Sequence, residues 1–176
     1  MSMLKIPVRP EDHIDGEADA PCTLVEYGDY QCPHCGRAYP IVKRVQKHFG
    51  KRLRFVFRNF PLNEIHPQAE TAAETAEFAG SQGKYWEMHD ALFENQNHFS
   101  PAFFPELAQK LGLDAAGLRD ALATEKYRAH VRSDFMSGAR SGVNGTPTFF
   151  INGQRLDGPW DYQELVDAIN GALAGS

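Results

Sequence analysis

The hydrophobic pattern of the first third of the chain predicts a strand, a helix and a second strand. Residues 23–27, Thr-Leu-Val-Glu-Tyr, are mostly β-branched, apolar or aromatic, which is typical of a short strand. After a tight loop, apolar residues recur at the spacing of one helical face: Ala38, Ile41, Val42, Val45 and Phe49. Pro33 suits the first helical position, and Gly50 ends the pattern. With a second strand expected over residues 53–60, the unit predicts a right-handed crossover onto a parallel sheet.

The middle of the chain, from about residue 67 to residue 143, has a helical pattern and no credible strand. One predicted face consists of small residues: Ala69, Ala72, Ala73 and Ala76. A bulkier face follows, made of Tyr85, Met88, His89, Leu92 and Phe93. We therefore expect a helical insertion of four or five helices.

Strand signals return near the carboxyl end, at residues 148–151. Asn152-Gly153 is a strong hairpin signal, because a type I′ turn needs positive φ at both central residues. Asp161 and Glu164 fit a capping box at the start of a last helix. The order is then βαβ, helical insertion, ββα, which predicts an α/β fold with a helical lid.

Composition and charge exclude several classes of protein. A chain of 176 residues that is 42% hydrophobic can bury a full core, and three cysteines are too few for a disulfide framework. A net charge of −5 argues against a nucleic-acid partner, which needs a basic face. The apolar runs fall far short of the ~20 residues that span a bilayer, so no membrane insertion is expected. Residues 1–19 lack the apolar core of a signal peptide. As it stands the sequence indicates a cytoplasmic protein, or a periplasmic one if a signal has been removed.

The stretch Cys32-Pro33-His34-Cys35 carries the chemistry. Two cysteines at this spacing either ligate a metal or cycle between dithiol and disulfide. The pair opens a helix, where unpartnered N–H groups and the helix dipole stabilise a thiolate. The first cysteine of such a motif lies at the exposed end and has a lowered pKa. Cys32 is therefore the expected nucleophile, and Cys35 the more buried thiol.

The ring of His34 is expected to favour the Cys32 thiolate, which makes the disulfide an oxidant of other dithiols. Two alternatives remain: a structural pair of core cysteines, or half of a zinc site. Zinc needs four ligands, and the chain has neither a second C-x-x-C nor an H-x₃₋₅-H, so Cys22 and a remote histidine would have to complete it. The other histidines lack ligand spacing and are interpreted as surface or satisfied core residues: His66, His89, His98 and His130.

Two segments resemble the DsbA-like branch of the thioredoxin superfamily. They are residues 26–35 (Glu-Tyr-Gly-Asp-Tyr-Gln-Cys-Pro-His-Cys) and residues 145–153 (Gly-Thr-Pro-Thr-Phe-Phe-Ile-Asn-Gly). The resemblance implies a thioredoxin fold with an inserted all-helical subdomain. The expected division is an extended arm over residues 1–20, a thioredoxin-like domain and a helical insertion over residues 67–143. The thioredoxin-like domain comprises residues 21–66 and 144–176.

The resemblance also implies roles for individual residues. Pro147 is expected to be a cis proline packed beside Cys32, leaving the backbone of Thr146 free to pair with an extended substrate peptide. Glu26 falls on the family's buried acid and is a candidate proton acceptor for Cys35. The alternatives are an ordinary trans proline that opens a strand, and for Glu26 an ion pair with one of two arginines, Arg54 or Arg58.

The predicted function is a thiol–disulfide oxidoreductase that exchanges its Cys32–Cys35 disulfide with cysteines of proteins or peptides. The disulfide is then the only cofactor, without metal. The expected partner is an unidentified redox protein or glutathione, and a monomer is expected. Cys22 is expected to be a spectator thiol. Two other functions stay open: a kappa-class glutathione-transferase-like enzyme, although such enzymes have another residue in place of Cys32, and a peptide-binding chaperone with idle cysteines. The net direction of exchange also stays open.

Overall fold

The central feature of the computed structural model, which describes residues 2–175, is a mixed sheet with the strand order β1-β3-β2-β4-β5. The strands are β1 (His13–Asp15), β2 (Cys22–Gly28), β3 (Leu53–Asn59), β4 (Thr148–Ile151) and β5 (Gln154–Arg155). β2 and β3 are parallel and are joined by α1 (Pro33–Phe49), so the predicted strand–helix–strand unit is confirmed. β1 and β4 run antiparallel to their neighbours.

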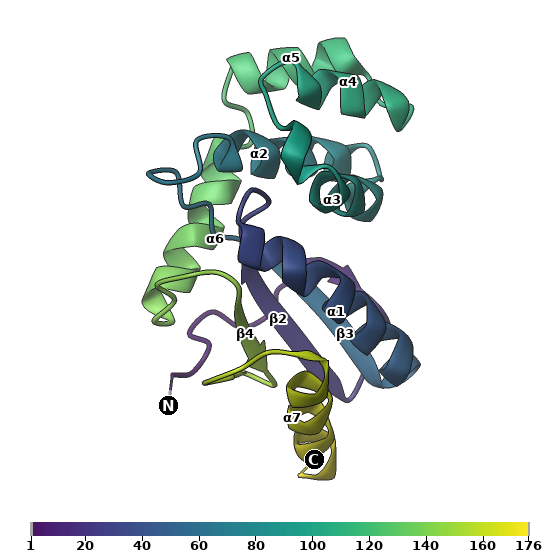
Figure 1. Cartoon of the computed structure of the whole chain (residues 1–176), viewed down its shortest axis with the longest axis vertical. Coiled ribbons are helices and arrows are strands. Elements are labelled where there is room, and N and C mark those ends of the chain that lie inside the picture. The colour runs from purple at the N-terminus through teal and green to yellow at the C-terminus, as the bar shows by residue number, and fades with distance from the viewer. Residues whose placement is uncertain (1, 176) are drawn as a thin grey trace.

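Side chains that alternate along the strands supply two hydrophobic cores. On one face, the larger core joins the sheet to α1 and to α7 (Tyr162–Ala174); its strand members include Leu24, Phe55, Phe57, Phe149 and Ile151. On the other face, a smaller core is formed by Val25, Tyr27, Val56, Phe60, Val143 and Phe150. In Figure 1, α1 and α7 lie in front of the sheet, and most of the remaining helices rise above one end of it.

The inserted helices are α2 (Ala69–Ser81), α3 (Tyr85–Glu94), α4 (Phe103–Lys110), α5 (Ala115–Ala123) and α6 (Arg128–Arg140). The predicted small-residue face of α2 is buried, which allows close helix packing. Figure 1 shows α4 and α5 farthest from the sheet, with α2 and α3 between, while α6 descends along the side of the molecule toward β4. The predicted fold class, a thioredoxin fold with an all-helical insertion, is confirmed. None of the helices within residues 2–175 is long and apolar enough to cross a membrane.

The amino-terminal segment, expected as an extended arm, adds strand β1 to the edge of the sheet beside β3. Its anchor is Arg58, whose side chain is only 1% exposed. Arg58 makes a two-pronged ion pair with Asp12 at 2.9 Å and donates to the carbonyl oxygens of Ile6 and Pro7. The segment is therefore fastened by buried polar contacts as well as by strand pairing.

The carboxyl-terminal hairpin and helix follow their sequence signals. Asn152 and Gly153 have φ values of 47° and 86°, so both central residues of the turn adopt the predicted left-handed region. The side chain of Asn152 also accepts a hydrogen bond from the backbone N–H of Thr23. Asp161 caps α7 by accepting from the backbone N–H of Glu164 at 3.1 Å.

Candidate active site

Cys32 is the N-cap residue of α1, and Pro33 begins the helix, as predicted. All three cysteines are free thiols in this structure. Cys32 is 3% exposed and Cys35, one turn along, is fully buried. The order of exposure is the expected one, although Cys32 is far less open to solvent than the motif alone suggested. In the thiol form, Cys32 Sγ lies 3.7 Å from the carbonyl oxygen of Thr146.

The surroundings of the two thiols push their pKa values apart. The pKa of Cys32 is lowered to about 5, chiefly by a hydrogen bond from the Cys35 thiol. Burial opposes this shift, while Thr146 and the backbone N–H groups of Cys35 and His34 reinforce it. Burial raises the pKa of Cys35 well above its usual range, and its hydrogen bond to Cys32 and the charge of Glu26 add to the rise. The pair is therefore one thiolate and one thiol near neutral pH.

His34 contributes through its backbone rather than through its ring. The side chain is exposed and its Nδ1 is hydrogen-bonded by the guanidinium of Arg37. Only the backbone N–H of His34 is among the groups that lower the pKa of Cys32. Of the two expected sources of thiolate stabilisation, the N–H groups at the start of the helix are among these contacts and the imidazole is not, while the Cys35 thiol makes the largest contribution.

A pair of His34 variants separates the two sources. His34→Ala keeps the backbone N–H and is expected to leave the Cys32 pKa near its present value of about 5. His34→Pro removes that donor, and we expect the pKa to rise by roughly one unit. Proline is tolerated in the first helical turn, so the fold should persist. Ultraviolet thiolate absorbance across a pH titration measures both. An equal rise of the Cys32 pKa in the two variants would show that the His34 ring, and not the backbone N–H, stabilises the thiolate.

Glu26 is buried on β2 and faces the cysteines. Burial, and then the charge of Cys32, raise its pKa to about 8. The alternative of an ion pair with an arginine is wrong: Arg54 donates to Thr23, and Arg58 is paired with Asp12. Space on this face is tight, since a Cβ at Gly28 would lie 2.8 Å from Glu26 Oε2 and 2.5 Å from the ring of Phe57. With a pKa of about 8, the Glu26 carboxyl beside the thiols can supply a proton to Cys35 in its protonated form and accept one in its ionised form.

The two shifted pKa values predict a specific pH dependence of stability. Glu26 keeps its proton in the folded state up to about pH 8, so its contribution to stability falls as pH rises from its ordinary pKa toward 8. Cys32 loses its proton near pH 5, so its contribution rises with pH above 5. In the reduced wild type the two slopes oppose each other.

Glu26→Gln removes one of these slopes. Between pH 6 and pH 7 the free energy of unfolding of the reduced variant should rise by about 1 kcal/mol relative to the wild type. Urea denaturation at the two pH values measures this difference. The control is Cys32→Ser, whose stability should fall over the same range because only the Glu26 slope remains. Parallel pH profiles in the two variants would contradict the assignment.

The loop before Cys32 is organised by Asp29, whose role the sequence analysis missed. One carboxylate oxygen of Asp29 accepts from the backbone N–H groups of Gln31 and Cys32, at 2.8 and 3.2 Å. The other accepts from the N–H of Leu62 and from His66 Nδ1, at 2.9 and 2.7 Å. The contact with Gln31 is the local turn that aspartate often makes, which is the one signal in the sequence.

Gln96, from the helical insertion, holds the same loop from the other side. Its amide donates to the carbonyl oxygens of Tyr30 and Cys32, at 2.8 and 2.9 Å. A Cβ at Gly36 would lie 2.2 Å from Gln96 Oε1, so a larger residue there would displace the Gln96 side chain from its present position. No sequence pattern links Gln96 to Cys32, because 64 residues separate them.

The loop opposite Cys32 contains Thr146 and Pro147, joined by a cis peptide bond. Both residues are half-buried, and the Thr146 carbonyl oxygen is the one that faces Cys32 Sγ. Together with Cys35 and Glu26, these residues form one cluster around the nucleophile.

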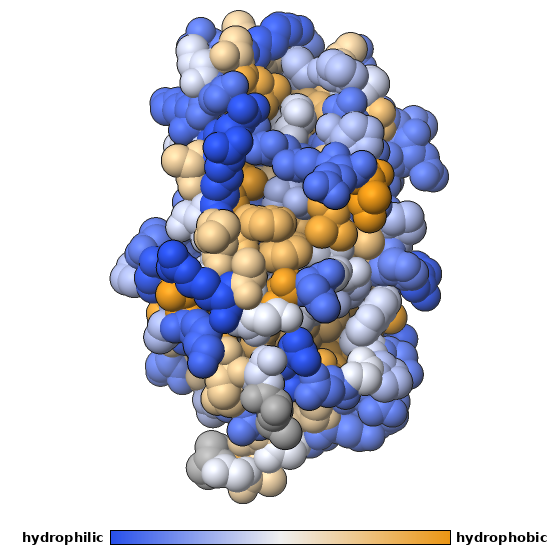
Figure 2. Space-filling view, turned by 90° about the vertical axis from the view of Figure 1, so that its left-hand side faces the viewer, coloured by the Kyte–Doolittle hydropathy of each residue, from blue (hydrophilic) through white to orange (hydrophobic). Residues whose placement is uncertain are grey.

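Beside this cluster lies an apolar hollow of about 630 Å³ between the β3–α2 loop and α6. Its apolar lining is Pro61, Leu62, Ile65, Val131, Phe135 and Met136. Ile65 and Met136 are 68% and 50% exposed, which is unusual for large apolar side chains. Figure 2 shows apolar side chains gathered at mid-height of this face. Because Leu62 is bonded to Asp29, the hollow borders the active-site loop.

Cys22 begins β2 and is fully buried, and burial raises its pKa to about 11. A thiol with such a pKa is not nucleophilic near neutral pH. We expect Cys22→Ala to retain the wild-type rate of disulfide exchange, measured with a dithiol peptide. A disulfide of Cys22 with Cys32 or Cys35 in a peptide map would contradict this expectation.

A helix-initial C-x-x-C opposite a Thr–Pro loop, on a sheet with this strand order, defines a thioredoxin-fold protein. The sequence profile described as thioredoxin matches residues 9–171, and the chain belongs to this family. BdbD from Bacillus subtilis, in its oxidised form, superposes with a TM-score of 0.89 at 26% identity and 99% coverage of both chains. A thioredoxin-like oxidoreductase from Silicibacter pomeroyi gives 0.81 at 27% identity, with 96% and 95% coverage.

Other comparisons extend the fold and the sequence likeness. Wolbachia pipientis alpha-DsbA1 shares the fold, with a TM-score of 0.84 at 19% identity, over 98% and 95% of the two chains. In sequence, 98% of this chain is 42% identical to part of a protein of Salinispora arenicola named Na(+)/H(+) antiporter NhaA 1. The match covers 26% of that relative, so the chain spans about a quarter of its length.

Proposed function

We propose that this protein is a thiol–disulfide oxidoreductase whose Cys32–Cys35 pair exchanges electrons with cysteines of protein or peptide substrates. The observation that carries the proposal is the separation of the two pKa values: Cys32 at about 5, and Cys35 well above its usual range. A stable thiolate at Cys32 makes it both a good nucleophile and a good leaving group. Antiport activity is not proposed for this chain, because it matches only about a quarter of the length of the relatives named as antiporters.

In the oxidising direction, a substrate thiolate attacks Cys32 Sγ of the disulfide. The Cys32–Cys35 bond breaks, and Cys35 leaves as a thiolate that takes a proton, for which the Glu26 carboxyl is the nearby donor. A second substrate thiolate then attacks the substrate sulfur of the mixed disulfide and displaces Cys32. The substrate loses two electrons to form its disulfide, and Cys32 and Cys35 end as thiolate and thiol.

The low pKa of Cys32 favours this direction. Each unit by which the pKa falls stabilises the reduced form and makes the couple more oxidising by about 30 mV. An oxidant of this kind is useful where thiols are not kept reduced, so an oxidising compartment such as the periplasm is part of the proposal. The disulfide itself is the redox cofactor.

Substrate capture is assigned to the surfaces on either side of Cys32. The Thr146–Pro147 loop offers backbone groups to an extended peptide, in the manner of an added strand. The apolar hollow beside the active-site loop suits side chains of an unfolded substrate. Unfolded chains supply both features, which favours protein substrates over small thiols.

The test uses a fluorescent peptide with two cysteines, mixed with stoichiometric oxidised protein. We expect one peptide disulfide per protein and none with Cys32→Ser. Peptide binding without oxidation would favour a chaperone, and conjugation of glutathione to an electrophile would favour a kappa-class transferase. Either result in place of peptide oxidation would overturn the proposal.

A further inference from the structure

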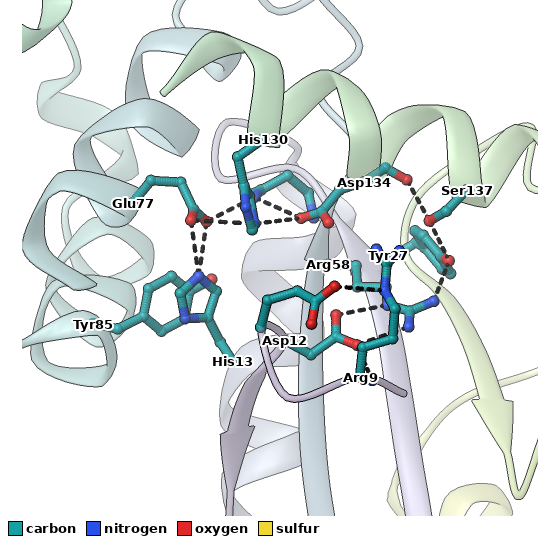
Figure 3. A network of polar contacts seen from close by, with 12 residues as sticks. Arg9, Asp12, His13, Tyr27, Arg58, Glu77, Tyr85, His130, Asp134 and Ser137 are labelled. Atoms are coloured by element: carbon teal, nitrogen blue, oxygen red, sulfur yellow. Dashed lines mark hydrogen bonds and ion pairs between the residues drawn. The ribbon is translucent and has the colours of Figure 1, made fainter. Parts of the chain in front are cut away.

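Three ligand-type side chains meet away from the cysteines, at the junction of the sheet and the helical insertion. His13 comes from β1, Glu77 from α2 and His130 from α6 (Figure 3). His13 Nε2 lies 2.9 Å from both carboxylate oxygens of Glu77, and His130 Nε2 lies 3.2 Å from Glu77 Oε1. The ligand atoms of all three lie within 4.8 Å of one another.

The negative charge around this cluster is not balanced by a permanently charged side chain. The side chains of Glu77 and Asp134 are only 5% and 6% exposed. Among the described residues, the ion-pair partners of these two carboxylates are His13 and His130. Neither carboxylate forms an ion pair with a lysine or an arginine of the described chain. Arg58 is engaged by Asp12. Two buried carboxylates without a permanent cation are costly, and a divalent ion would neutralise them.

The spacing of the ligand atoms suits a tetrahedral ion. Zinc–nitrogen and zinc–oxygen bonds near 2.0–2.1 Å place neighbouring ligand atoms about 3.3 Å apart in a tetrahedron. The two histidine contacts to Glu77, at 2.9 and 3.2 Å, are close to this value, and the two imidazole nitrogens lie within 4.8 Å of each other. His130 is 33% exposed, which leaves an entry path from solvent.

The groups behind the ligands are also arranged to hold them. Asn59 Nδ2 donates to Glu77 Oε2 at 3.0 Å, which leaves Oε1 for the ion. The ring of His13 is stacked on that of Tyr85, with centroids 3.5 Å apart. Metal ligands are typically oriented by such second contacts.

We propose that His13, Glu77 and His130 bind one divalent cation of the zinc class, with the fourth position open to water or to Asp134. Two imidazoles and one carboxylate suit zinc, which accepts nitrogen ligands, better than calcium or magnesium, which prefer oxygen alone. Each ligand comes from a different element. The ion therefore joins the amino-terminal strand to α2 and α6, and its role is structural, independent of the disulfide chemistry.

The experiment uses the full chain without an affinity tag, stripped with a chelator and held in the Cys32–Cys35 disulfide form so that these thiols cannot bind metal. Calorimetry should show one equivalent of Zn²⁺ bound, a rise in Tm with zinc, and neither with Ca²⁺ or Mg²⁺. The Co²⁺ form should show tetrahedral visible bands without a thiolate-to-cobalt charge-transfer band. Absence of stoichiometric zinc binding, or a thiolate band from Cys22, would overturn the proposal.

Variants assign the ligands. His130→Ala, at the most exposed ligand, should weaken zinc binding by at least about 100-fold. His48→Ala, an exposed histidine on α1, should bind as the wild type does. Equal affinity in the two variants would refute the site.

A measurement on the wild type guards against a variant that fails to fold. Zinc should protect His13 and His130 from diethyl pyrocarbonate, as read by mass spectrometry, while the exposed His48 and His98 stay reactive. Equal modification of all four with and without zinc would also refute the site.

Discussion

Cys32→Ser is expected to abolish disulfide exchange, whereas Cys35→Ser should accumulate mixed disulfides between Cys32 and substrate. The two thiols differ because Cys32 is stabilised as a thiolate, and Cys35, buried beside Glu26, stays protonated until it must resolve the intermediate. Non-reducing electrophoresis and mass spectrometry of each variant with a thiol substrate measure the outcome. Mixed disulfides formed through Cys35 in Cys32→Ser would reverse the two roles.

Alkylation kinetics test the same assignment in the reduced wild type. At pH 6 a soft alkylating agent should modify Cys32 rapidly, because its pKa is about 5 and the thiolate is the reactive form. Cys22, with a pKa of about 11, is the internal control and should stay unmodified. The rate at Cys32 should fall with decreasing pH, with a midpoint near 5. Rapid labelling of Cys35, or a midpoint near that of a free thiol, would contradict the account.

The elements of the thioredoxin core could be predicted from the sequence because their signals are local. Apolar spacing marks α1, the β-branched and aromatic run marks β2, and Asn152-Gly153 marks the last hairpin. The strand β1 escaped prediction because its three residues pair only at the edge of β3, and the buried Arg58 that anchors the segment is far along the chain.

The residues of the active site also differ in whether a local sequence signal predicts them. Cys32 and Cys35 lie in one helical turn, so their spacing and the helix start could reveal them from sequence. Asp29 and Gln96 shape the loop through contacts made by folding, and the latter comes from the helical insertion. Their amino-acid types have no pattern that points to a cysteine.

The histidines of the proposed metal site also could not be predicted from the sequence. The sequence indicates a surface or satisfied core residue at His130, because no other histidine lies at ligand spacing along the chain. Its neighbours in space, His13 and Glu77, come from two other elements. Ligands that come from three distant segments have no characteristic spacing in the sequence. Such a site can be found only in the folded structure.

Removal of one charge in the amino-terminal segment, that of Asp12, is expected to cause a large loss of stability. Asp12→Ala leaves the guanidinium of Arg58 buried without its carboxylate, and breaking a buried pair in this way costs about 3–5 kcal/mol. The pair is visible in Figure 3, where Asp12 meets the arginine from the side opposite Tyr27. The free energy of unfolding from urea denaturation measures the loss.

Two control variants test whether the loss of stability in Asp12→Ala comes from the broken ion pair. Asp19→Ala, at an exposed aspartate of the same segment, should change stability by less than about 0.5 kcal/mol. Asp12→Ala combined with Arg58→Met should be less destabilised than the sum of the single variants, because the second change removes the unpaired charge that the first one leaves. The hydrogen bonds of Asp12, chiefly from Arg58, outweigh its burial and lower its pKa, so the pair's contribution should persist above the ordinary aspartate pKa and fade as pH drops below it. If Asp12→Ala were as stable as Asp19→Ala, the buried ion pair would not be what fastens this segment to the sheet.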